Sequence, residues 1–90
     1  MVDRDTRLDN ALGGPGKTFT YNYTLINFTK DKIDLDFFIN KMRPQILSYL
    51  RTNPSMDTFR ENDVLMNYTY KDNRGVFLCN IEIKPEEYKN

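Results

Sequence analysis

Polar and apolar side chains alternate without a break over residues 18–25, and no other feature restricts the fold of this chain as strongly. The apolar members of the pattern are Phe19, Tyr21, Tyr23 and Leu25. The polar members are Thr18, Thr20, Asn22 and Thr24. Because successive side chains of a strand point to opposite faces, the pattern predicts a strand over residues 18–28 with one buried and one wet face. Antiparallel sheets that are covered on one side have this character.

The residues just before this strand, 13–18, read Gly-Gly-Pro-Gly-Lys-Thr and superficially match a phosphate-binding loop. The first glycine of that motif would fall on position 11, which is Ala11. The motif also needs a following helix whose free N–H groups hold the phosphate, whereas a strand follows here. We therefore interpret the segment as a hairpin turn, in which glycine supplies positive φ and proline cannot join the ladder.

The remaining elements follow from the spacing of apolar residues. Further strands are predicted at residues 6–12, 64–71 and 76–84. In the last of them, Phe77, Cys79, Ile81 and Ile83 are expected on one face. A long helix is predicted from Leu35 to about residue 50, with Asp34 as its N-cap and a kink near Pro44. Asn53 and Pro54 then predict the start of a short helix over residues 55–61.

These elements predict an α+β fold of the two-layer sandwich type. Four strands that are each apolar on one face need a cover, and the amphipathic long helix supplies it. The order strand, strand, helix, strand, strand is taken to form a four-stranded antiparallel sheet, covered on one face by the long helix, with one short helix in addition. We expect a single domain over residues 1–90, with residues 1–5 and 86–90 as flexible ends.

Composition argues against several classes of function. The chain has 13 basic and 13 acidic side chains and no net charge, so bulk electrostatic attraction to nucleic acid is not expected. It has no histidine, which removes the usual general base and the commonest metal ligand. Its one cysteine cannot form an internal disulfide. No apolar stretch is long enough to span a membrane.

We expect no catalytic site, no metal site and no cofactor. Cys79 lies on an apolar strand face, where a buried thiol is inert. Asp34 is explained as a helix cap and Asp36 as a favourable charge in the first helical turn. The other acidic groupings are Glu86 with Glu87, and Asp3 with Asp5 and Asp9. The first lies in a polar tail, and the second lacks the pattern of a calcium loop.

Two other groups of residues are candidates for binding. Phe37 falls on the polar side of the long helix, and with Lys41, Pro44 and Leu47 it forms a candidate partner surface. An unpaired edge strand at residues 6–12 is a second place where a partner could add. The alternative is an aromatic pocket lined by Tyr21, Tyr23, Tyr68 and Tyr70. We interpret these tyrosines first as core, because the long helix must cover the face on which they lie.

Several short motifs are similar to those of a group of small bacterial envelope proteins. The motifs are Val2-Asp3-x-x-Thr6-x-Leu8, Gly14-Pro15-Gly16, Tyr21-x-Tyr23-Thr24-Leu25-x-Asn27, Arg43-Pro44-Gln45-Ile46, Thr52-Asn53-Pro54 and Tyr68-x-Tyr70-x-Asp72-x-x-Gly75. The resemblance implies a location in the envelope or periplasm, and a membrane tether or export segment that is absent from this chain. Many members carry two cysteines at positions that correspond to Arg51 and Tyr88 here, so the resemblance implies that this chain lacks their disulfide.

The expected function is therefore that of a non-catalytic protein-binding or assembly module of the bacterial envelope. Its partner is expected to be a protein and not a nucleic acid. The alternative is a small-molecule or peptide carrier that uses a tyrosine-lined space between helix and sheet.

Overall fold

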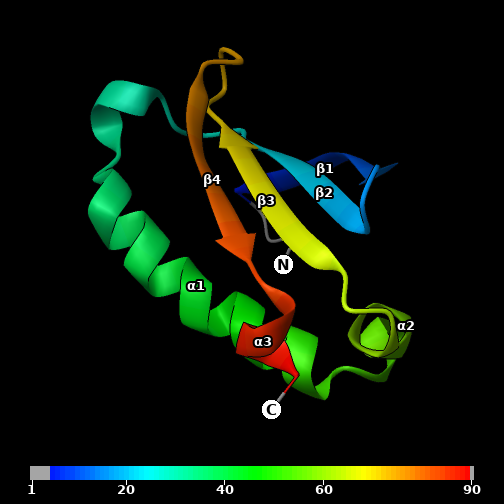
Figure 1. The fold of residues 1–90 in the computed structure, drawn as a ribbon. Helices are drawn as coiled ribbons and strands as arrows, with labels where there is room; N and C mark the ends of the chain where they lie inside the picture. Colours follow the sequence, from blue (N-terminus) through cyan, green and yellow to red (C-terminus); the bar gives the residue numbers. More distant parts are fainter. Residues whose placement is uncertain (1–4, 90) are drawn as a thin grey trace.

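A computed structural model of the chain describes residues 5–89. Residues 1–4 and 90, which belong to the two ends expected to be flexible, lie outside the described residues. The strands are β1 (Thr6–Gly14), β2 (Thr18–Leu25), β3 (Leu65–Lys71) and β4 (Phe77–Ile83). The α-helices are α1 (Leu35–Thr52), α2 (Asp57–Glu61) and α3 (Pro85–Tyr88), and short 3₁₀ turns η1 (Lys30–Lys32) and η2 (Pro54–Met56) precede α1 and α2. The α+β class, the four strands, the long helix and the short helix are confirmed (Figure 1).

The sheet is mixed, and the expectation of an entirely antiparallel sheet is wrong. Its strand order is β1-β2-β3-β4. The outer pairs β1–β2 and β3–β4 are antiparallel hairpins, but the central pair β2–β3 is parallel. The reason is the single long helix between β2 and β3. Because α1 carries the chain back along the sheet, β3 starts at the same end as β2 and must run in the same direction.

Two β-bulges change which side chains face the helix. Asp9 has no partner on β2, and Leu78 has none on β3. Each extra residue reverses the alternation of the strand. Phe77 therefore lies on the open face, opposite Lys71, and Leu78 is buried in its place. The expectation that Phe77 shares a face with the other apolar residues of β4 is wrong for this reason.

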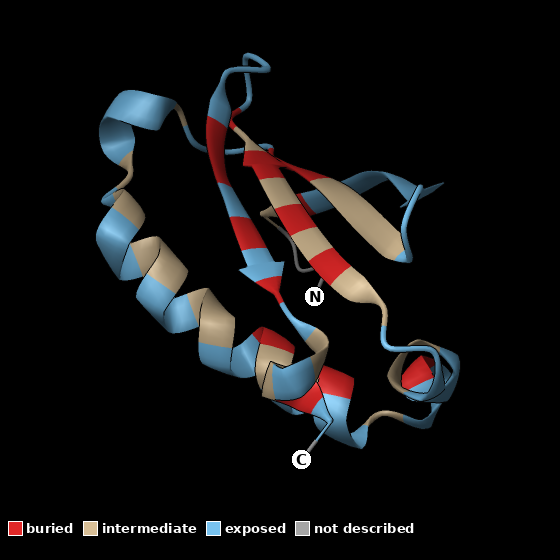
Figure 2. Ribbon diagram, viewed as in Figure 1, coloured by how far each residue is buried: buried red, intermediate tan, exposed pale blue. Residues whose placement is uncertain are grey.

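The core lies between the sheet and the C-terminal half of α1. Its fully buried members include Ile46 and Leu50 of α1, Tyr68 and Tyr70 of β3, Ile81 and Ile83 of β4, and Tyr88 of α3. Figure 2 shows that the buried part of α1 is confined to the half of the helix beside α3. Residues 86–88, expected to belong to a polar tail, instead form part of α3, whose Tyr88 enters the core.

The opposite face of the sheet is polar, as the alternation predicted. The strand register places Asn10, Asn22, Thr69 and Asn80 in one row across all four strands. Asn22 donates to Asn10 at 2.7 Å, and Thr69 donates to Asn80 at 2.7 Å. These side chains satisfy one another, so this face needs no apolar cover.

The turns and caps agree closely with the sequence. Residues 15–17 join β1 to β2, and Gly16 and Lys17 adopt positive φ angles of 68° and 59°. The hairpin interpretation of this segment is confirmed. The Asp34 carboxylate caps α1 by accepting from Phe37 N at 3.1 Å. Asn53 caps the following turn by accepting from Ser55 N at 2.9 Å.

Candidate functional site

A groove of about 640 Å³ opens between the N-terminal half of α1 and the ends of β1 and β2. We call it the N-terminal groove. It is lined by Asp5, Thr6, Leu25, Phe28, Ile33, Asp34, Phe37, Phe38, Lys41, Met42 and Gln45. Six of these eleven side chains are apolar, which gives the groove an apolar floor with charged groups at its margin.

The groove exists because α1 is buried unevenly along its length. The buried residues of α1 are Ile46 and Leu50, both in its C-terminal half. Among the strands, α1 approaches β4 most closely, on the opposite edge of the sheet from β1. The first turns of the helix therefore stand away from β1 and the end of β2, as Figures 1 and 2 show.

Two aromatic rings of the groove are exposed to solvent. Phe37 is 66% exposed and Phe28 is 39% exposed. Phe37 points outward because it lies about 100° round the helix from Phe38, which packs against the core. An exposed apolar patch beside a concave apolar surface is typical of a binding site.

The wall that carries Phe28 is fixed by Asp72, a buried residue at the β3–β4 turn. Its carboxylate accepts from the backbone N–H groups of Lys30 at 2.9 Å, Arg74 at 2.8 Å and Val76 at 2.9 Å. Burial of the carboxylate opposes its ionisation, but the hydrogen bonds more than offset this and lower the pKa of Asp72 below its usual value.

A second backbone contact, from Asn73 N to Phe28 O at 2.9 Å, fastens the same segment. The start of β1 is bonded to the residues just before Phe28. Asn27 donates to the Asp5 carboxylate at 2.6 Å, and Ile26 N donates to Asp5 O at 3.0 Å. Specific hydrogen bonds from both the start of β1 and the β3–β4 turn therefore hold the segment that carries Phe28.

The structure separates the four residues of the predicted partner surface. Phe37 and Lys41 line the groove and are exposed. Pro44 is exposed but lies outside the lining, where Gln45 takes part instead. Leu47 is half-buried and packs against the core, so it adds little to an exposed surface.

Phe28 is the groove residue that sequence analysis missed. Sequence analysis placed it at the end of the strand predicted over residues 18–28. It lies in the groove because the Asp72 carboxylate holds the loop around η1. No local pattern predicts that contact. The exposed position of Phe37 on the polar side of the helix was the only signal in the sequence.

The four tyrosines lie apart from the groove lining and mostly in the core. Tyr23, Tyr68 and Tyr70 are buried, and Tyr21 is half-buried. Their rings stack, with centroids 5.1 Å apart for Tyr23 and Tyr70 and 5.3 Å apart for Tyr21 and Tyr68. Burial raises the pKa of Tyr23 to about 12 and raises the pKa of Tyr68 as well, so both hydroxyls are neutral at physiological pH.

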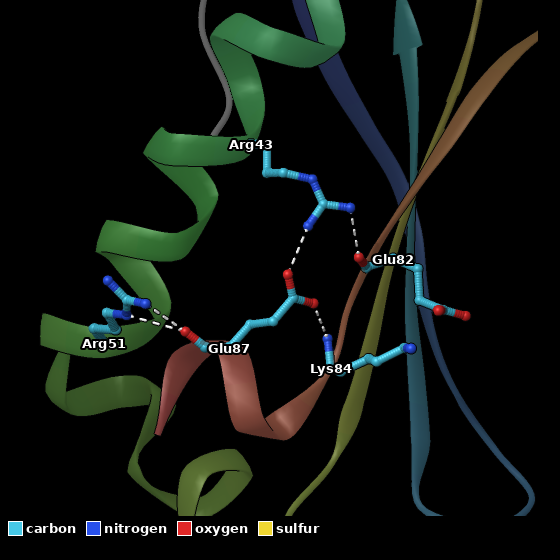
Figure 3. Close-up of polar contacts among 5 residues, drawn as sticks. All are labelled: Arg43, Arg51, Glu82, Lys84 and Glu87. Carbon is cyan, nitrogen blue, oxygen red and sulfur yellow. Dashed lines mark hydrogen bonds and ion pairs between the residues drawn. The ribbon is translucent and has the colours of Figure 1, made fainter. Parts of the chain in front are cut away.

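A polar cluster joins α1 to α3 and β4 (Figure 3). Arg43 donates to the Glu87 carboxylate at 3.0 Å and to the backbone oxygen of Glu82 at 3.0 Å. Arg51 donates to the backbone oxygen of Glu87 at 3.1 Å through Nε and at 2.5 Å through Nη2. Arg51 thus holds α3 at the residue that precedes Tyr88.

This polar cluster also covers the outer edge of the sheet at β4. Glu82 O belongs to the outer edge of β4, and the Arg43 side chain occupies it. Sheet edges that are covered in this way are protected from pairing with other chains. The other edge strand, β1, is interrupted by the Asp9 bulge and carries an Arg7–Asp9 ion pair of 2.7 Å. Both features make the edge strand a poorer partner surface than the N-terminal groove.

The other chemical candidates occupy ordinary structural positions. Cys79 is buried, and burial raises the pKa of its thiol. Within residues 5–89, no group of three or more acidic or cysteine side chains is placed to hold a metal ion. Asp3 of the N-terminal acidic cluster lies outside the described residues. None of the described helices is long and apolar enough to cross a membrane.

Comparison of the chain with protein-family models, with curated proteins and with solved structures finds no match.

Proposed function

We propose that this protein is a non-catalytic protein-binding or assembly module and that its partner contacts the N-terminal groove. The observation that supports this most directly is Phe37, 66% exposed at the margin of an apolar groove. Aromatic side chains beside concave apolar surfaces are frequent anchors of protein interfaces. The motifs shared with envelope proteins are the reason for proposing the bacterial envelope or periplasm as its location.

The walls of the groove support the same proposal. Asp72 and Asp5 both fix the segment that carries Phe28 by hydrogen bonds, so this side of the groove is in place before a partner arrives. A preformed surface binds at a smaller entropic cost than one that must be ordered on binding. The absence of net charge is compatible with an interface whose affinity comes from apolar contact.

The direct test is site-specific photo-cross-linking in the native host. A photoreactive phenylalanine analogue replaces Phe37 in one variant and Phe77 in the control. Phe77 matches Phe37 in chemistry and, at 55% exposed, in accessibility. It lies on the opposite face of the sheet, so it serves as the control. We expect a defined protein adduct from position 37 and none from position 77. Equal labelling from both positions, or none from position 37, would contradict the proposal.

A Phe37→Ser variant provides the matching binding test. Since most of the ring is already in solvent, the substitution is expected to change the free energy of unfolding by less than about 0.5 kcal/mol. The adduct partner should be lost from Phe37→Ser and retained by Phe77→Ser. A stably folded Phe37→Ser protein that binds its partner normally would exclude the groove as the contact.

The alternative function is a carrier of small molecules or peptides. The volume of the groove, about 640 Å³, is within the range of about 300–1,000 Å³ that is usual for small-molecule sites. The tyrosines proposed for this function are stacked on one another, so the groove is the better location for a ligand. Native mass spectrometry of protein purified from its host distinguishes the two functions. A bound small molecule favours the carrier, and unliganded protein with a cross-link from position 37 favours the binding module.

A further inference from the structure

We infer that the N-terminal groove binds a second copy of this chain, through antiparallel pairing of the two α1 helices about a two-fold axis near Phe37 and Phe38. This inference rests on the proposed function and specifies the partner. Closed two-fold dimers are the commonest assemblies of soluble proteins, and each uses one self-complementary patch. The exposed side of α1 has the features of such a patch.

The first feature is the arrangement of charges along α1. Asp34, Phe37 and Lys41 line the groove and follow one side of the helix at spacings of three and four residues. Asp34 and Lys41 are two helical turns apart, with Phe37 and Phe38 midway between them. In an antiparallel pair centred there, Asp34 of one copy lies opposite Lys41 of the other, and the reverse pair forms by symmetry.

The second feature is that these two charges are available. Asp34 and Lys41 are both exposed, and neither forms an ion pair with another residue in the range 5–89. Asp34 uses Oδ1 to cap the helix at Phe37 N, which leaves the second carboxylate oxygen facing away from that bond. A charge of each sign on one patch is complementary to a rotated copy of the same patch.

The third feature is the combination of a projecting ring and an apolar groove. Phe37 projects from α1, and Phe28, Ile33 and Phe38 line the surface next to it. Two-fold symmetry would place each Phe37 ring against the groove of the other copy. The chain carries no net charge, so no long-range repulsion opposes the approach of two identical copies.

The test is sedimentation velocity of the full chain from roughly 10 µM to roughly 1 mM, a range that covers weak dimers. We expect reversible dimerisation that Phe37→Ser abolishes. Lys41→Glu would place two acidic groups opposite each other and should raise the dimer Kd by about tenfold or more. Adding Asp34→Asn to Lys41→Glu removes that repulsion while keeping a good N-cap residue, so it should recover part of the affinity. Lys84→Glu, the same charge change at an exposed lysine beside α3, is the control and should leave the Kd unchanged.

Each outcome bears on the dimer separately from the proposed function. A monomer throughout this range overturns the dimer, as does a dimer that is insensitive to both Phe37→Ser and Lys41→Glu. If the chain is monomeric but position 37 still cross-links to a different protein, the binding module stands and its partner is another chain. If position 37 cross-links to nothing in the host, the proposed function fails as well.

Discussion

Replacement of Tyr88 by phenylalanine tests whether the C-terminal helix is part of the folded core. Tyr88 is 1% exposed, and its hydroxyl donates to Val64 O and lies 3.2 Å from Phe59 O. Tyr88→Phe keeps the ring but removes the hydroxyl donor from Val64 O, while Phe59 O keeps its bond from Val64 N at 3.2 Å. Losing this hydrogen bond and leaving a carbonyl without its donor should lower the free energy of unfolding by about 1.5 kcal/mol. The whole stability of a 90-residue domain is roughly 5–13 kcal/mol, so the loss should be easy to measure.

Urea denaturation followed by circular dichroism provides the assay, with thermal melting as a second measurement. For a domain of this size, 1.5 kcal/mol corresponds to a fall in Tm of roughly 6–12 °C. Tyr49→Phe, at a half-buried tyrosine of α1, is the matched control and should change stability by less than about 0.5 kcal/mol. If Tyr88→Phe is as stable as the control, the hydroxyl does not hold α3 to the core and the reasoning is wrong.

Three other substitutions test individual contacts. Asp72→Asn should lower the urea midpoint at pH 7. The difference in urea midpoint between this variant and wild type should shrink below pH 3.8, because a carboxyl group with a lowered pKa stabilises the fold only while it is ionised. Arg43→Met removes the bonds to Glu87 and to the β4 edge, so we expect the free energy of unfolding to fall by about 1 kcal/mol. The uncovered edge should also increase self-association, measured by light scattering. Asn53→Ala removes the side-chain cap of η2, and the free energy of unfolding measured by urea denaturation should fall by about 1 kcal/mol.

The elements of the fold could be predicted from the sequence because each depends on local pattern and local chemistry. The alternation over residues 18–25 defined β2, and helical spacing with an Asp34 cap defined the start of α1. The turn uses the conformational freedom of Gly16, and Lys17 beside it also adopts a positive φ. All of these depend on residues that are near one another in the chain.

The direction of the central strands and the two bulges could not be found in the same way. A single crossover helix makes β2 and β3 parallel, but the period of the side chains is the same in either direction. The bulge at Leu78 depends on the pairing of β4 with β3, so Phe77 was placed on the wrong face. In the same way, the burial of Tyr88 depends on contacts with residues 59 and 64, far away in the sequence.

The candidate site was predictable only in part, for the same reason. Phe37 was recognisable because an aromatic residue on the polar side of a helix breaks the local pattern. Phe28 was not, since it reaches the groove through a loop that Asp72 holds from the far end of the sheet. Leu47 was proposed from its place in the sequence beside the others, but the curvature and contacts of the packed helix turn it toward the core.

The hydrogen bonds that hold the loop beside the groove support the proposal that the groove binds a partner. An α1 of 18 residues is roughly 27 Å long, enough to cover a strand of seven or eight residues from end to end. Its fully buried residues lie only in the C-terminal half, while in the N-terminal half Phe38 packs against Tyr70 of β3 and Phe37 stays exposed. The loop before the helix is fastened to the β3–β4 turn by the Asp72 carboxylate and by Asn73. The Asp72 carboxylate accepts from three backbone N–H groups, one of them in the loop that carries Phe28, whose side chain stays 39% exposed. The exposed rings of Phe37 and Phe28, beside a loop fixed in this way, support the proposal of a partner that covers them.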